Sequence, residues 1–88
     1  MSNKLKIGAI TWKIKRAIIQ DMGTTCFNES EITIKKGLEK QIEKETLLHE
    51  ILHIAFVQTG HADKMDEGLI DALAYTLLDT GLMNLDEF

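Results

Sequence analysis

The chain has 88 residues, a net charge of −4 and one cysteine. A chain of this length forms one small domain with a marginal core, and a single cysteine excludes an internal disulfide framework. Hydrophobic residues make up 44% and charged residues 27%, which is typical of a globular domain and not of a disordered chain. No stretch approaches the roughly 20 apolar residues of a membrane span, and no apolar export signal opens the chain. We therefore expect a cytoplasmic protein with no membrane partner.

Charge is distributed unevenly along the chain. Residues 1–45 carry nine basic and six acidic side chains, whereas residues 46–88 carry one basic and eight acidic side chains. The basic half lacks the interleaved aromatic residues of a nucleic-acid surface, and the isoelectric point of about 5.2 is acidic. A solvated, lysine-rich face of a sheet explains the basic residues of the predicted strands better than a nucleic-acid-binding surface does. These residues are Lys13, Lys15, Arg16, Lys35 and Lys36.

The first third of the chain has the pattern of short strands. Apolar and polar residues alternate in Leu5–Ile7, Ile10–Lys15 and Glu31–Lys35, and Thr24–Phe27 is a further short candidate. The segments between them are brief. We therefore predict three or four antiparallel strands, because a parallel pair needs a longer crossover.

Two helices are predicted to follow these strands. The first covers about residues 38–58, and it is apolar almost all round from Thr46 to Val57. The second covers about residues 64–80, with Asp63 as its N-cap. The predicted fold class is α+β, a single domain over residues 1–88 in which a small antiparallel sheet packs on both helices.

The first predicted helix contains the sequence His49-Glu50-Ile51-Leu52-His53. Histidines four residues apart on a helix lie one above the other, so both imidazoles can bind one Zn²⁺. Glu50 can reach a water on the metal and act as general base, as in the H-E-x-x-H arrangement of zinc peptidases. Polar side chains in such an apolar run are costly to bury, and a metal site removes that cost.

A catalytic zinc site needs a third protein ligand. Glu67 and Asp71 lie one turn apart on the second predicted helix. Their repulsion disappears if Glu67 binds the metal and Asp71 accepts the other ring N–H of a ligand histidine. We favour Glu67 as the third ligand, with Asp71 and His61 as alternatives. His61 could also hydrogen-bond a developing oxyanion, and Tyr75, one turn beyond Asp71, could donate a hydrogen bond into the site.

The arrangement His49-Glu50-x-x-His53 followed by Glu67-x-x-x-Asp71 resembles the gluzincin metallopeptidases. The small size and the order strands, helix, helix look more specifically like phage and prophage peptidase domains akin to the ImmA/IrrE type, over about residues 31–78. The chain has Asp71-Ala72-Leu73 where that type has Glu-Ala-Asn. The resemblance implies a zinc-dependent regulatory protease that acts on a protein, such as a repressor. It also implies His49, His53 and Glu67 as metal ligands.

The function predicted from the sequence is therefore hydrolysis of a peptide bond with a zinc cofactor and with Glu50 as general base. The predicted strand Glu31–Lys35 could pair with an extended peptide substrate. Two other function classes stay open. One is a zinc-stabilised binding module without turnover, and the less favoured one is a nucleic-acid-binding domain.

Overall fold

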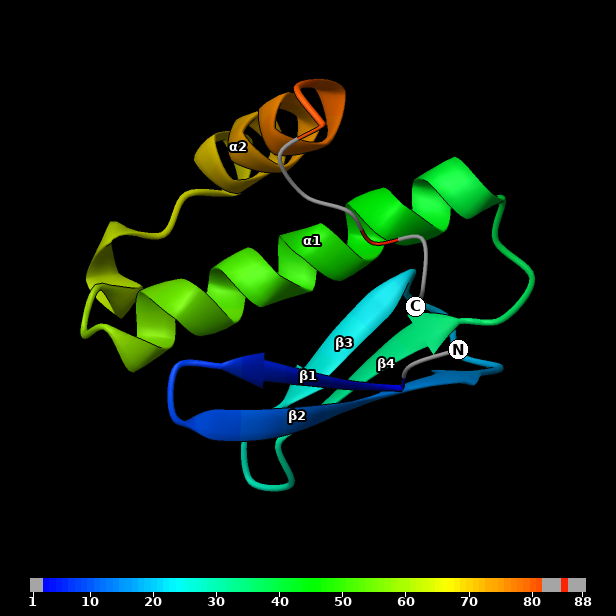
Figure 1. Ribbon diagram of the computed structural model, residues 1–88, viewed down its shortest axis with the longest axis horizontal. Coiled ribbons are helices and arrows are strands. Elements are labelled where there is room, and N and C mark those ends of the chain that lie inside the picture. Colours follow the sequence, from blue (N-terminus) through cyan, green and yellow to red (C-terminus); the bar gives the residue numbers. More distant parts are fainter. Residues whose placement is uncertain (1–2, 82–84, 86–88) are drawn as a thin grey trace.

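The computed structural model describes residues 3–81 and residue 85, and it has the α+β class that was predicted. Its elements in chain order are β1 (Lys4–Ile7), β2 (Ile10–Ala17), β3 (Gly23–Cys26), β4 (Glu31–Lys35), α1 (Lys40–Gln58), a short 3₁₀ turn (Ala62–Lys64) and α2 (Glu67–Asp79). Figure 1 shows α1 lying across one face of the sheet and α2 on the side of α1 away from the sheet. Within the described ranges, no helix is long and apolar enough to cross a membrane.

The sheet is mixed, so the prediction of a purely antiparallel sheet is wrong. The strand order is β1-β2-β4-β3, in which β1–β2 and β3–β4 are antiparallel and β2–β4 is parallel. Strand β3 follows β2 in the chain but does not pair with it, because β4 lies between them. Residues 18–30, which include β3, supply the long connection that a parallel pair requires.

The inner face of the sheet is built by the alternation seen in the sequence. Trp12 and Ile14 from β2 and Ile32 and Ile34 from β4 are each at most 3% exposed, and they pack against α1. Ile14 is the register partner of Ile32 across the parallel pair, so the two strands present their apolar side chains to the same face. The period-two pattern therefore gave the correct inward residues although it did not reveal the strand order.

Helix α1 is apolar on more than one face because it is covered on two sides. It packs against β3 and β4 on one side and against α2 on the other, while α2 packs on α1 and not on the sheet. The prediction that the sheet packs on both helices is therefore wrong for α2. Leu47, Leu48 and Ile54 are buried, as are Ile70 and Ala74 of α2. A helix between two layers needs an apolar surface all round, which is the pattern that the sequence shows from Thr46 onward.

The ends of the helices differ from the predicted ones by a few residues. Helix α2 begins at Glu67 and not near residue 64, and its N-cap is Asp66, whose carboxylate accepts a hydrogen bond from the Leu69 amide at 3.1 Å. The predicted N-cap Asp63 is wrong, because Asp63 lies within the 3₁₀ turn. The chain takes up the 3₁₀ turn before α2, so the cap falls three residues later than predicted, at Asp66.

One basic strand residue faces inward. Arg16 is two residues beyond Ile14 on β2, and its guanidinium forms hydrogen bonds of 2.7 and 2.9 Å with both carboxylate oxygens of Glu43 on α1. The sequence predicted that Arg16 belongs to the solvated basic face of the sheet. The structure shows that this prediction is wrong for Arg16. The hydrogen bond from Arg16 lowers the pKa of Glu43 despite partial burial, which acts in the opposite direction. This bidentate pair joins the sheet to the first half of α1.

Candidate functional site

Three potential metal ligands converge at the boundary between α1 and α2. The Nε2 atoms of His49 and His53 are 3.0 Å apart, as expected for histidines one turn apart on a helix. Each also lies 3.2 Å from one carboxylate oxygen of Glu67, the first residue of α2. One ligand atom from each of the three residues lies within 4.8 Å of the others. The structure thus brings together the two histidines and the acid that the sequence favoured.

Local backbone structure delivers Glu67 to this point. Gly60, at φ +78°, ends α1 in a conformation that favours glycine, and the His61 amide donates to the Phe56 carbonyl at 2.7 Å. The chain then reverses through the 3₁₀ turn, and the Asp66 cap starts α2. Glu67 consequently stands in the first turn of α2, opposite the two histidines.

The outer nitrogens of both imidazoles have acceptors of their own. His49 Nδ1 is 2.9 Å from Asp71 Oδ1, and His53 Nδ1 is 3.1 Å from the Met65 sulfur. A carboxylate and a thioether accept hydrogen bonds and do not donate them, so these contacts favour the tautomers in which each Nδ1 carries the proton. In the neutral tautomers, both Nε2 atoms then point unprotonated lone pairs at the Glu67 carboxylate.

This arrangement gathers acceptors without a donor between them. A proton on one Nε2 would give a donor to the other Nε2 or to Glu67, but one N–H does not satisfy all three groups equally. A divalent cation satisfies all three acceptors at once. Ligand atoms on a tetrahedral zinc ion with bonds of about 2.0–2.1 Å are separated by about 3.3 Å. The observed separations of 3.0–3.2 Å are close to that value.

Glu50 lies beside this cluster and is held from the sheet. Its Oε1 accepts a hydrogen bond of 2.5 Å from the Thr25 hydroxyl on β3. The strand can approach this closely because residue 23 is glycine: a Cβ there would lie 2.7 Å from Thr46 Cγ2 and 3.4 Å from Glu50 Cγ. Strand β3 therefore fixes the carboxylate that the sequence predicted as the general base.

Sequence reasoning missed two residues that orient the cluster. Thr25 and Met65 contact Glu50 and His53, respectively, across gaps of 25 and 12 positions in the chain. Neither belongs to a recognisable spacing pattern. Asp71, by contrast, was predicted to accept from a ligand histidine, and the structure places it against His49.

Two further candidates lie away from the cluster. His61 is exposed, and its Nδ1 is 3.0 Å from the Thr59 hydroxyl; it does not belong to the group of converging ligand atoms among the described residues. Tyr75 is 65% exposed and lines a separate hollow with Glu45 and Asp79. The geometry therefore gives neither residue a place beside the three converging ligands.

A groove opens next to the cluster, between the start of β3, α1 and α2. Its volume is about 440 Å³, and its walls include both His49 and Glu50. Its lining residues are Met22, Gly23, Ile42, Glu45, Thr46, His49, Glu50, Asp71 and Ala74. His49 and Glu50 are thus accessible from a hollow large enough for side chains of another molecule.

Comparisons of this chain with models of protein families, with curated proteins and with solved structures found no match.

Proposed function

We propose that this protein is a zinc-dependent peptidase. The observation that supports the proposal best is the convergence of His49 Nε2, His53 Nε2 and the Glu67 carboxylate, with separations of 3.0–3.2 Å. Two histidines and one glutamate form a ligand set used by catalytic zinc sites, which keep a further position open. Glu50 adds the carboxylate that hydrolysis requires and that simple metal storage does not.

The residues of the site would have different roles in this reaction. His49, His53 and Glu67 would hold the cation, and Asp71 would keep His49 in the tautomer whose Nε2 is free to bind. A bound divalent cation supplies polarisation of the scissile carbonyl and acidification of a water molecule. Glu50 takes a proton from that water and later passes it to the leaving amine. The Thr25 hydrogen bond keeps the carboxylate in reach.

The proposed peptide-binding strand differs from the one predicted. Strand β4 (Glu31–Lys35) cannot pair with a substrate, because it is bonded to β2 on one edge and to β3 on the other. Strand β3 pairs only with β4 among the described strands, and its Thr25 contacts Glu50. An extended peptide added to β3 would therefore pass next to the general base.

The same ligand set can also bind iron or manganese, so the metal must be identified directly. Metal analysis of the freshly purified protein should give about one equivalent of zinc per chain. The resemblance to phage-type peptidases remains the ground for proposing a single protein substrate such as a repressor.

The decisive experiment separates metal binding from turnover. Glu50→Gln should keep zinc and lose cleavage of a peptide library, because an amide cannot accept the proton. His49→Ala should lose both zinc and cleavage. Glu67→Ala should weaken zinc binding, whereas His61→Ala should not. Equal cleavage by the wild-type and Glu50→Gln proteins would refute the catalytic role, and full zinc binding without any cleavage would indicate a binding module.

A further inference from the structure

A second hollow lies along the boundary between α1 and α2. It has a volume of about 320 Å³ and is lined by Gln41, Glu45, Tyr75, Leu78 and Asp79. Glu45 lines both this hollow and the groove beside Glu50. The α1 residues that line the two spaces run from Glu50 back to Gln41, so the spaces adjoin at Glu45 on the side of the proposed reaction centre toward the start of α1.

The walls of the two spaces combine apolar and acidic side chains. The groove is lined by Met22 and Ile42, apolar side chains that are 56% and 37% exposed, and by the carboxylate of Glu45. The second hollow adds the carboxylate of Asp79. Among the described residues that line either space, none is a lysine or an arginine. A molecule that fits these walls therefore needs both an apolar and a cationic group.

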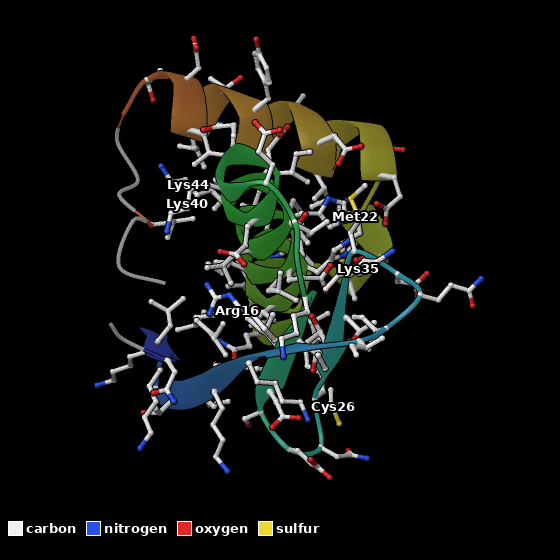
Figure 2. All side chains as sticks on the ribbon, turned by 90° about the vertical axis from the view of Figure 1, so that its right-hand side faces the viewer. Arg16, Met22, Cys26, Lys35, Lys40 and Lys44 are labelled. Carbon is white, nitrogen blue, oxygen red and sulfur yellow. The ribbon has the colours of Figure 1, made fainter. Side chains whose placement is uncertain are left out.

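The carboxylate of Glu45 lacks a partner from its own chain. Glu45 is half-buried and forms no hydrogen bond or ion pair within residues 3–81. Figure 2 shows Lys40 and Lys44 on the opposite side of α1 from Met22, and Lys44 lines a different hollow with Arg16. The lysines of α1 thus do not occupy the groove. An unpaired carboxylate in the wall of a groove attracts a cation from another molecule.

We propose that the substrate segment bound here combines an apolar side chain with a lysine or arginine a few residues away. The apolar side chain would cover Met22 and Ile42, and the cation would pair with Glu45 and Asp79. The inference rests on the proposed peptidase function, since it specifies which peptides that site accepts. Apolar burial supplies affinity, and the two carboxylates supply selectivity by charge.

Binding to the Glu50→Gln protein tests this selectivity without requiring turnover. The probes are fluorescein-labelled peptides of seven residues with leucine at the centre. Each peptide has one variable position, which lies before the leucine in some peptides and after it in others. That position carries lysine, glutamine or glutamate. At one position, the lysine peptide should bind about 3- to 10-fold more tightly than the glutamine peptide in low salt, with the preference reduced at high salt. Fluorescence polarisation measures both. Equal affinities at every position would overturn the proposal.

Substitutions at Glu45 then locate the preference. In the Glu50→Gln background, Glu45→Gln should remove most of the preference for the lysine peptide. Glu45→Lys should reverse that preference in favour of the glutamate peptide. The control is Glu39→Gln, which removes the same charge just before α1, outside both hollows and from a side chain without a capping bond. A preference that survives Glu45→Gln, or that Glu39→Gln removes equally, would refute the assignment.

Cleavage of the same peptides by the wild-type protein distinguishes the two proposals. Charge-selective binding without hydrolysis would overturn the peptidase function and leave the binding preference standing. Hydrolysis without charge preference would support the peptidase function and overturn this inference.

Discussion

Single side chains outside the H-E-x-x-H sequence orient the proposed reaction centre. Asp71 and Met65 accept from the outer nitrogens of His49 and His53, and Thr25 holds Glu50. These contacts decide which lone pairs face the centre of the cluster. The helix spacing alone places the imidazoles on one face but leaves their tautomers and the carboxylate orientation undetermined.

Loss of the Thr25 hydroxyl should affect turnover more than binding. We predict that Thr25→Val lowers kcat about tenfold with little change in KM or zinc content, because Glu50 loses the hydrogen bond that aligns it. Thr24→Val is the matched control, since Thr24 is the exposed neighbour on the same strand. Steady-state kinetics on a cleavable peptide measure both variants. An equal loss in both would indicate damage to β3 and not misalignment of Glu50.

Asp71 should influence metal affinity through His49. We predict that Asp71→Ala weakens zinc binding about 10- to 100-fold, the usual effect of removing the acceptor behind a ligand histidine. A competition titration with a chromophoric chelator gives the affinity. Asp63→Ala removes an exposed carboxylate from the 3₁₀ turn and should leave the affinity unchanged. If Asp71→Ala bound no zinc under any condition, Asp71 would have to be considered as a ligand itself.

Among the secondary-structure elements, local patterns were predictable and long-range pairings were not. The alternation of Ile32 and Ile34 identifies a strand and its inner face, because burial of alternate side chains is a local property. The sequence does not show that β4 lies between β2 and β3, since that depends on the path of residues 18–30. For the same reason the histidine pair was predictable, whereas the contact of Thr25 with Glu50 required the strand order.

The ion pair between β2 and α1 should make folding sensitive to acid. Arg16 holds the pKa of Glu43 below its ordinary value of 4.5. The stabilisation is therefore complete above about pH 4.5, and it is lost as the pH falls through the lower, folded-state pKa. Glu43→Gln should reduce the free energy of unfolding by about 1–2 kcal/mol at pH 7 and by less at pH 3.

Urea unfolding at several pH values measures this difference. The control is Glu31→Gln, which removes the ion pair with the 54% exposed Lys15 side chain and should cost less than about 0.5 kcal/mol. A cost for Glu43→Gln that did not diminish in acid would mean that the effect comes from packing and not from the charge.

In the molecule as a whole, α2 depends on α1 for its attachment. It has no packing contact with the sheet, and only Ile70 and Ala74 of its residues are fully buried. The proposed metal would join Glu67 of α2 to two histidines of α1, and it would thus act as the cross-link that a small domain without disulfides often needs. The acidic second half of the chain is then partly explained by a cation at its centre.

Removal of the metal should therefore loosen α2 before the rest of the fold. Zinc at 100 times its dissociation constant stabilises the native state by about 2.7 kcal/mol, so chelation should lower Tm by roughly 10 °C or more. Amide exchange should accelerate across Glu67–Asp79 and stay slow in the strands, because α2 opens locally once its cross-link to α1 is gone. In the Glu67→Ala protein, chelation should change neither Tm nor the rate of amide exchange in α2 appreciably. Equal acceleration in sheet and helix would show that the metal supports the entire fold and does not act mainly at the boundary of α1 and α2.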